Sequence, residues 1–271
     1  MSNNSPIGVF DSGVGGLTVV REITRQLPNE SIIYFGDTAR VPYGNKSQET
    51  VTIYSRQIVH FLMKNKVKAI VIACNTASAF ALETLKHEIA IPIIGVVKPG
   101  AKAAYLTTQN KRIGVIGTVG TTNSKIYNKY IEAYDKDIFV DNEPCPLFVP
   151  LVEEGMIEDS ITEEMIRRYT KRLLSENIDT LVLGCTHYPL LKDVIQKVLG
   201  NNINLVNPAY ETAIALKNIL QKNNLLNTDT TEAKHRFYVS DGAEQFKAFA
   251  NKILTCHVEE IRDINNIESY M

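Results

Sequence analysis

Two cysteines occupy matching positions in the chain. Cys74 and Cys185 each follow a short apolar run and a small residue, and polar residues come directly after them. Each run is typical of a strand that gives way to a helix, and a helix N-terminus, with roughly half a positive charge, lowers the pKa of a nearby thiol. A buried packing role is the alternative for any one cysteine. We expect both to be near ionisation at neutral pH and to take part in chemistry.

The surroundings of these two cysteines resemble each other. Ala69–Ala79 and Thr180–Leu190 share the order of an apolar strand, a small residue, Cys, two polar residues and a helix. This echo suggests a duplicated unit, although α/β units also come to look alike by chance. Cys145 and Cys256 lack the same context, and we interpret them as packing residues.

Polar side chains also follow the other expected strands. Ligands of open α/β sheets bind beyond the carboxyl ends of the strands, so this set is the candidate site. It comprises Asp11-Ser12-Gly13, Asp37-Thr38, Cys74-Asn75-Thr76, Gly117-Thr118, Cys185-Thr186-His187 and Ser240-Asp241-Gly242.

Two members of this set allow more than one interpretation. Asp11 opens a glycine-rich run that is not the G-x-G-x-x-G fingerprint, and its carboxylate would repel a pyrophosphate but suit an ammonium group. Capping of the next helix by Asp11 and Ser12 is the alternative. His187 could stabilise a Cys185 thiolate, or it could be a surface or capping histidine. The chain has no C-x-x-C or H-x-x-x-H pair, so no metal site is predicted.

The elements that must position these residues alternate along the chain. Short apolar runs, typical of strands covered on both faces, alternate with amphipathic stretches such as Val51–Leu62. Ser160 and Glu163 are set as a capping box, and a helix is expected from Pro189 to Gly200. The alternation predicts an α/β fold with mainly parallel sheets flanked by helices. The expected strands are Ile7–Phe10, Ile32–Phe35, Ala69–Ala73, Ile93–Val97, Arg112–Ile116, Ile138–Val140, Thr180–Leu183, Ile203–Val206 and Phe237–Val239.

Composition limits the class of protein. A chain of 271 residues holds one large domain or two modest ones. Its formal net charge of −1 argues against nucleic acid as a partner, because such proteins usually carry a basic excess. Four cysteines are too few for a disulfide scaffold. No secretory signal and no membrane-spanning run is found, so we expect a cytoplasmic protein with reduced thiols and no membrane partner.

Five stretches together give the chain a specific resemblance. In this order and over nearly the whole length, they resemble the glutamate racemases, cofactor-independent amino-acid racemases of bacterial cell-wall (peptidoglycan) synthesis within the aspartate/glutamate racemase superfamily. They are Pro6-Ile-Gly-Val-Phe-Asp-Ser-Gly-Val-Gly-Gly-Leu17, Gly36-Asp-Thr-Ala-Arg-Val-Pro-Tyr-Gly44, Ala73-Cys-Asn-Thr-Ala-Ser78, Gly184-Cys-Thr-His-Tyr-Pro189 and Ser240-Asp-Gly-Ala-Glu244.

The resemblance implies two similar α/β domains that face each other across an active-site cleft. The first would be discontinuous, from residues 1–97 and 207–271, and the second would span residues 98–206. These limits agree with two plausible crossovers, at Val97-Lys98-Pro99-Gly100 and at Asn207-Pro208. A single sheet of nine strands is the alternative that the strand pattern leaves open.

The resemblance also implies a mechanism. Racemisation removes a proton from Cα on one face and returns one on the other, so one cysteine starts as a thiolate and the other as a thiol. Cys74 and Cys185 would take these roles with no cofactor and no metal. Asp11 and His187 would each assist the cysteine on its own side, and Glu153 would support His187. The substrate, glutamate, would be bound by Asp11, Ser12, Tyr43, Gly44, Asn75, Thr76, Thr121, Thr186 and His187. Family members often form homodimers.

Three alternatives remain open at this point. The chain could be an aspartate or hydantoin racemase of the same superfamily, which a substrate panel would distinguish. It could be a non-catalytic small-molecule receptor with two facing domains, although the helix-start cysteines argue against this. It could also be a redox or metal protein that uses Cys74 and Cys185, which metal analysis would test.

Overall fold

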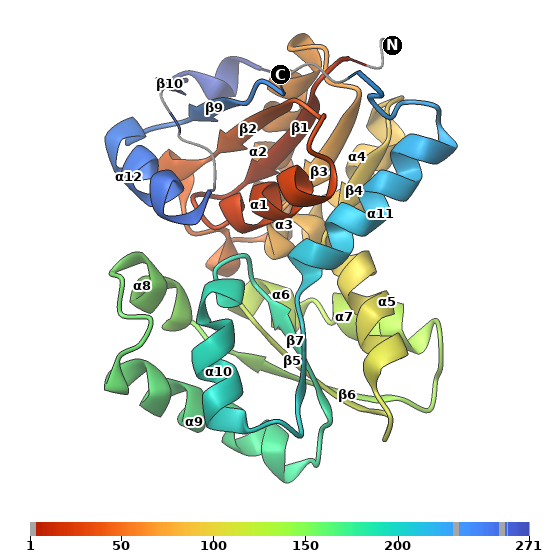
Figure 1. The fold of residues 1–271 in the computed structure, drawn as a ribbon, viewed down its shortest axis with the longest axis vertical. Helices are drawn as coiled ribbons and strands as arrows, with labels where there is room; N and C mark the ends of the chain where they lie inside the picture. Colours follow the sequence, from red (N-terminus) through yellow and green to blue (C-terminus); the bar gives the residue numbers. More distant parts are fainter. Residues whose placement is uncertain (1–3, 230–232, 255–257, 259, 271) are drawn as a thin grey trace.

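The chain folds into two parallel sheets, each covered by helices (Figure 1). The computed structural model describes residues 4–229, 233–254, 258 and 260–270. The larger sheet has six strands in the order β10-β9-β2-β1-β3-β4, and all its pairs are parallel. Its strands are β1 (Ile7–Asp11), β2 (Ile32–Gly36), β3 (Ala69–Ile72), β4 (Ile93–Gly95), β9 (Arg236–Val239) and β10 (Ile261–Asp263).

The smaller sheet has four strands in the order β6-β5-β7-β8, again all parallel. In its register Ile116 lies opposite Leu183, and Gly117 lies opposite Gly184, so these two strands end side by side. The prediction of an α/β fold with two parallel sheets is therefore confirmed. The strands are β5 (Arg112–Gly117), β6 (Phe139–Pro144), β7 (Thr180–Gly184) and β8 (Asn204–Val206).

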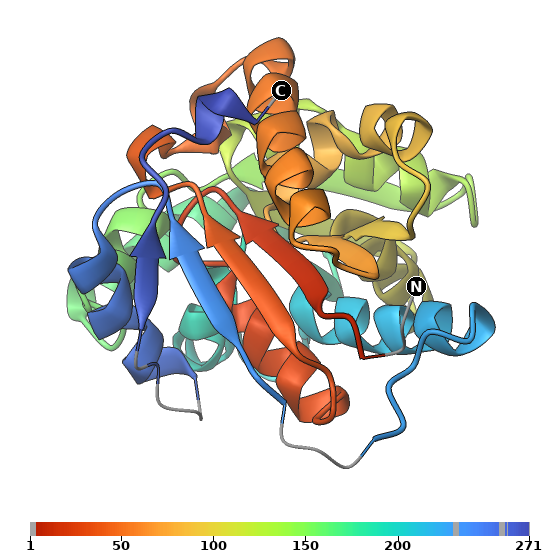
Figure 2. The same cartoon turned by 90° about the horizontal axis from the view of Figure 1, so that it is seen from above.

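Helices cover both faces of the larger sheet (Figure 2). The α-helices around this sheet and at the crossings are α1 (Leu17–Gln26), α2 (Gln48–Lys64), α3 (Asn75–Phe80), α4 (Leu82–Glu88), α5 (Val97–Thr107), α11 (Pro208–Lys222) and α12 (Ala243–Ile253). Those around the smaller sheet are α6 (Val119–Asn123), α7 (Ile126–Glu132), α8 (Phe148–Glu153), α9 (Ser160–Ser175) and α10 (Lys192–Leu199). Short 3-10 helices lie at Thr38–Arg40, Tyr43–Asn45, Tyr188–Leu191 and Ile267–Ser269.

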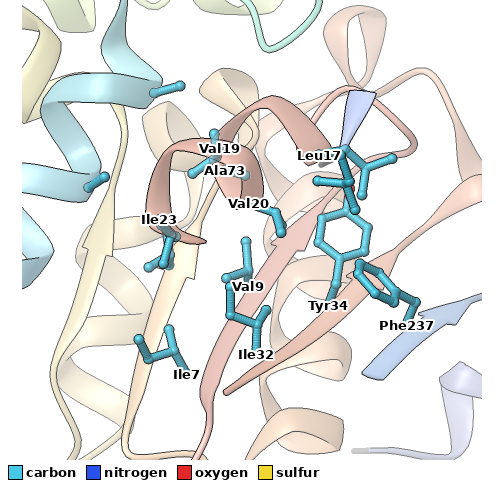
Figure 3. Packing of buried hydrophobic residues seen from close by; sticks show 14 of the residues in the cluster. Ile7, Val9, Leu17, Val19, Val20, Ile23, Ile32, Tyr34, Ala73 and Phe237 are labelled. Carbon is cyan, nitrogen blue, oxygen red and sulfur yellow. The ribbon is translucent and has the colours of Figure 1, made fainter. Parts of the chain in front are cut away.

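The amphipathic helix α1 forms part of the core on one face of the larger sheet. Leu17, Val20 and Ile23 fall on one face of the helix and are fully buried. Figure 3 shows this face packed on alternate residues of the central strands, among them Val9 and Tyr34. The sheet thereby holds the loop between β1 and α1, which carries the first predicted site residues.

A buried ion pair lies at the amino ends of the strands. Lys68, just before β3, places its Nζ 2.6 Å from Oε2 of Glu30, just before β2, and both side chains are almost completely buried. Glu30 also accepts the N–H of Asn227 at 2.8 Å, which ties the segment after α11 to the sheet. This pair is far along the strands from their carboxyl ends.

The chain passes between the two sheets through α5 and α11, which pack against each other. The smaller sheet lies within residues 112–206, and the larger takes its strands from both sides of that stretch. The domain limits at residues 97/98 and 206/207 stay a prediction. Within the described residues no helix is both long enough and apolar enough to cross a bilayer.

Three local predictions were wrong. Asp159, not Ser160, caps α9, since its side chain accepts the Ile161 N–H at 2.7 Å. The strand expected through Val97 ends at Gly95, because Val97 already begins α5. The strand expected to end at Val140 instead continues as β6 to Pro144. Strand β10 was not predicted.

Candidate active site

A cavity of about 350 Å³ lies where the carboxyl ends of the strands of both sheets meet. Of the catalytic and substrate-binding residues that the resemblance implies, all except Asp11 and Thr121 line it. Part of the wider strand-end set does not line it: Asp37, Thr38, Gly117, Ser240, Asp241 and Gly242. Both units contribute to its walls, which are more apolar than polar. The lining residues are Ser12, Gly13, Val41, Pro42, Tyr43, Gly44, Asn45, Cys74, Asn75, Thr76, Thr118, Val119, Cys145, Pro146, Val149, Pro150, Glu153, Cys185, Thr186, His187 and Tyr188.

Cys74 stands at the helix start that the sequence predicts, but its pKa is shifted in the opposite direction. Its Sγ caps α3 and accepts the Ala77 N–H at 3.4 Å. Burial raises the pKa of Cys74 to about 12, and the charge of Asp11 adds to this, while hydrogen bonds from Ala77 and Ser12 oppose it. The predicted lowering was therefore wrong, because desolvation of the thiolate outweighs the short helix. Cys74 is held as a neutral thiol.

Cys185 has different surroundings. It lies in a turn, because the next helix is a 3-10 turn that begins at Tyr188 with His187 as its N-cap. The Cys185 Sγ is 3.8 Å from Nδ1 of His187, whose Nε2 is 2.8 Å from Oε1 of Glu153. The expected helix start at Cys185 is thus replaced by an imidazole partner.

The contacts of His187 with Cys185 and Glu153 determine its charge. Burial opposes protonation of His187, but its contacts with Cys185 and Glu153 outweigh burial and raise its pKa to about 10. His187 is therefore an imidazolium at neutral pH. An imidazolium beside a cysteine can stabilise a thiolate. The two cysteines consequently sit in unlike environments, one beside a cation and one desolvated.

Asp11 and Thr121 are completely buried behind the cavity wall. Oδ2 of Asp11 accepts the Gly13 N–H at 3.0 Å, and its Oδ1 lies 3.5 Å from the Thr186 hydroxyl. Burial raises the pKa of Asp11, while His187 and backbone N–H groups lower it. Thr121 Oγ1 lies 3.2 Å from Thr76 Oγ1. Both residues therefore reach the cavity only through neighbours.

Buried hydrogen bonds join the two units beside the cysteines. The Tyr127 hydroxyl donates to Oδ1 of Asn75 at 2.7 Å, next to Cys74 in sequence. The Thr18 hydroxyl donates to the Thr186 carbonyl at 2.8 Å, next to Cys185. These bonds hold the walls of the cavity together from both sides.

Two glycines mark the closest approach of the units. A Cβ on Gly15 would lie 2.3 Å from Thr186 Oγ1 and 2.5 Å from Nδ1 of His187. A Cβ on Gly44 would lie 2.6 Å from the Cβ of Thr118. Only glycine fits at these positions while the units stay in contact.

Cys145 is a wall residue that sequence reasoning took for a packing residue. It is fully buried, and burial raises its pKa, but it also lines the cavity. The signal was its position directly after β6, which the strand prediction ended too early. Cys256 lies outside the described residues. Among those described, no three His, Cys, Asp or Glu side chains are arranged to hold a metal ion.

Comparison with known proteins gives consistent results. A family model described as Asp/Glu/Hydantoin racemase matches residues 7–215. A glutamate racemase of Geobacter metallireducens is 49% identical over 248 residues, which is 92% of each chain. One from Thermoanaerobacter pseudethanolicus is 45% identical over 99% of this chain and 100% of its own.

Solved structures agree with these sequence matches. The crystal structure of a glutamate racemase isoform from Bacillus anthracis superposes with a TM-score of 0.94 at 42% identity, and covers 98% of this chain and 99% of its own. The crystal structure of a glutamate racemase from Francisella tularensis in complex with D-glutamate gives a TM-score of 0.92 at 40% identity. It covers 99% of this chain and 100% of its own.

Proposed function

The chain belongs to the Asp/Glu/Hydantoin racemase family and is a racemase, and we propose that it interconverts L- and D-glutamate by proton transfer between Cys74 and Cys185, without a cofactor. The observation that carries the mechanism is that Cys74 from the larger unit and Cys185 from the smaller unit line a single cavity, which Cys145 also lines. Glutamate as the substrate rests on the similarity to glutamate racemases at 45–49% identity.

The unlike environments of the two thiols supply the starting protonation states. One cysteine, as a thiolate, takes the Cα proton and becomes a thiol. The other, as a thiol, gives its proton to the opposite face of Cα and becomes a thiolate. Burial raises the pKa of Cys74, and Cys185 lies beside the cationic side chain of His187, so we assign abstraction of the first proton to Cys185 and its replacement on the opposite face to Cys74.

The other enantiomer needs the reverse state, with Cys74 as the thiolate. Only a small fraction of the enzyme is in that state, and the apparent affinity of the enzyme for this enantiomer is reduced by the same fraction. The two enantiomers have equal free energies, so kcat/KM must be the same in both directions. We therefore expect KM and kcat both to be larger for the enantiomer that Cys74 deprotonates.

Polar groups of the wall would stabilise the charge that develops on the carboxylate as Cα loses its proton. The candidates are the side chains of Asn75, Thr76 and Thr186, which line the cavity. The Tyr127 hydroxyl bonds the oxygen of the Asn75 amide, so the NH₂ group is the end left to donate to an anion. We assign the ammonium group to Ser12, with the charge of the buried Asp11 behind it.

The proposal is tested with purified protein, D- and L-glutamate and no added cofactor. Loss of optical activity should follow from either enantiomer, and aspartate should be a much poorer substrate. Activity that disappears on dialysis and returns only with pyridoxal phosphate would overturn the proposal.

Isotope labelling tests the pairing of the cysteines. In deuterated water the thiol on the far face exchanges with solvent before turnover, so the first D-glutamate formed from L-glutamate should carry deuterium. The recovered L-glutamate should stay unlabelled when the abstracted proton returns before exchange. Mass spectrometry of the separated enantiomers at low conversion measures both. Substantial unlabelled product would mean that one group serves both faces.

Three further assignments are proposals that rest on the family. A cytoplasmic location agrees with a mechanism that needs both thiols reduced. The D-glutamate would supply peptidoglycan synthesis, and the enzyme would act as a homodimer, which analytical ultracentrifugation would test.

A further inference from the structure

The motif at residues 36–44 contains a buried carboxylate with no part in the proton transfer. Asp37 is completely buried, directly after β2. Arg40 donates from Nε to Oδ1 and Oδ2 of Asp37 at 3.0 and 2.8 Å. The Tyr43 hydroxyl donates a hydrogen bond to Oδ2. A buried carboxylate with this many donors is a strong and directional anchor.

The motif at residues 240–244 supplies a further partner. The Ser240 hydroxyl donates to Oδ1 of Asp37 at 2.9 Å and accepts the Ala39 N–H at 2.8 Å. One serine after β9 thus holds both the carboxylate and the backbone of the loop that follows it. We call Asp37, Arg40, Tyr43 and Ser240 the Asp37 hub.

Arg40 does not carry free charge into the cavity. Its guanidinium group pairs with Asp37 at 2.8 Å, donates to Gln57 at 2.6 Å and lies 4.0 Å over the ring of Tyr54. The Arg40 side chain is only 11% exposed. The hub is therefore electrically balanced and rigid.

The far end of this loop is the part that meets the substrate cavity. Tyr43 and Gly44 line the cavity, and the Gly44 backbone is packed so closely on Thr118 that no Cβ would fit. The Tyr43 hydroxyl is already used by Asp37. What the loop can offer to a ligand is the Tyr43 ring and the backbone at Tyr43 and Gly44.

We propose that Asp37 is a positioning residue, which holds the Tyr43–Gly44 backbone against the cavity through the Tyr43 hydroxyl and so sets the affinity for glutamate. Ser240 is the second support of the same hub. The proposal rests on the proposed function for the identity of the substrate. It gives a role to two motifs that the cysteine chemistry leaves unexplained.

The test compares Asp37→Asn, Tyr43→Phe, Ser240→Ala and the double variant of Asp37 and Tyr43. Loss of a charge-assisted hydrogen bond is expected to raise KM for both enantiomers about tenfold in the Asp37 and Tyr43 variants, with kcat within about twofold of wild type. The Ser240 variant should raise KM about threefold. Calorimetric titration with D-glutamate should show matching losses of affinity.

Thr38→Ala is the matched control. Thr38 lies in the same loop and contacts the same C-terminal segment, since its hydroxyl accepts the Asp241 N–H at 3.0 Å, but its side chain makes no hydrogen bond to the four hub residues and does not line the cavity. Its KM should equal that of wild type. A general loosening of the loop would raise KM here as well, and that result would overturn the proposal.

Coupling provides the sharpest outcome. If Asp37 acts through Tyr43, the double variant should raise KM by much less than the product of the single effects. Independent effects that multiply, or a fall in kcat at unchanged KM, would overturn the proposal. If Asp37→Asn does not fold, Tyr43→Phe and Ser240→Ala provide the test. Unchanged KM and Kd in both of these variants would refute the proposal that the Asp37 hub sets the affinity for glutamate.

Failure of the proposed function would look different. Wild-type protein without glutamate turnover refutes the racemase activity on this substrate. In that case D-glutamate binding by calorimetry still reports on the hub. Unchanged affinity in the Tyr43 variant would overturn the hub by itself.

Discussion

The replacement Gly15→Ala tests whether the contact between the two units is the active arrangement. The added Cβ would lie 2.3 Å from Thr186 Oγ1, 2.5 Å from Nδ1 and 2.6 Å from Cε1 of His187. The His187 ring cannot turn away without losing its contacts with Glu153 and Cys185, and the bond from Thr18 to the Thr186 carbonyl fixes the backbone of Thr186.

The required displacement can be worked out from these contacts. Ordinary van der Waals contact begins at 3.4 Å, so the loops must separate by about 1 Å. A shift of about 1 Å in a group that transfers or positions a proton costs about a hundredfold in rate, or about 2.7 kcal/mol in the activation free energy. We expect kcat/KM to fall by about that factor for both enantiomers.

The assay is racemisation followed by circular dichroism, with the melting temperature measured in parallel. Gly200→Ala is the control, because Gly200 has φ +77° and no atom within 4 Å of the added Cβ. That variant should lose about 1 kcal/mol of stability through its strained backbone and keep its activity. A Gly15→Ala enzyme within about threefold of the wild-type kcat/KM would refute the reasoning.

Three other predictions concern single side chains. Cys74→Ala and Cys185→Ala should each lose at least about a thousandfold in racemisation, measured from both enantiomers, because each face of Cα needs its own acid or base. Glu153→Gln should lower the pKa of His187 by about one unit, since Glu153 is half-exposed and its charge partly screened; the basic limb of the kcat/KM profile should move to lower pH. The free energy of unfolding of this variant should be lower than that of wild type near pH 6. This difference should disappear as the pH rises through about 10, where wild-type His187 also loses its proton. Lys68→Met should cost about 3–5 kcal/mol in urea denaturation, because its buried carboxylate partner loses its cation. An unchanged racemisation rate would contradict the first prediction, an unchanged pH profile of kcat/KM the second, and an unchanged urea midpoint the third.

Features that depend on residues close together in the chain could be predicted from the sequence. The central strands were recognisable because Ile7–Asp11 and Thr180–Gly184 are buried on both faces and so read as continuous apolar runs. Strand β10 was not, since Ile261–Asp263 is a short, mostly exposed edge with an ordinary polar composition. The positions of Cys74 and Cys185 at strand ends followed directly from those runs.

What could not be predicted depends on contacts between distant segments. The pKa of Cys74 is set by burial and by Asp11, which a helix-start argument does not include. The contact of Asp37 with Ser240 joins residues far apart in sequence, and so does that of His187 with Glu153, which only the family resemblance indicated. A motif shows that such residues are present, but only the fold shows which atoms meet.

The order of strands in the larger sheet has a consequence for synthesis of the chain. Strand β2 ends at Gly36, and its outer neighbour β9 begins only at Arg236. At about 5–20 residues per second, the ribosome needs about 10–40 s to bring β9 out after β2. The smaller sheet is contiguous and is complete before then. During this interval the edge of β2 has no partner in its own chain, and an open strand edge is a template for pairing with other chains. Nascent protein is therefore most exposed to aggregation while Cys74 and Cys185 have already been made and its last core strands have not.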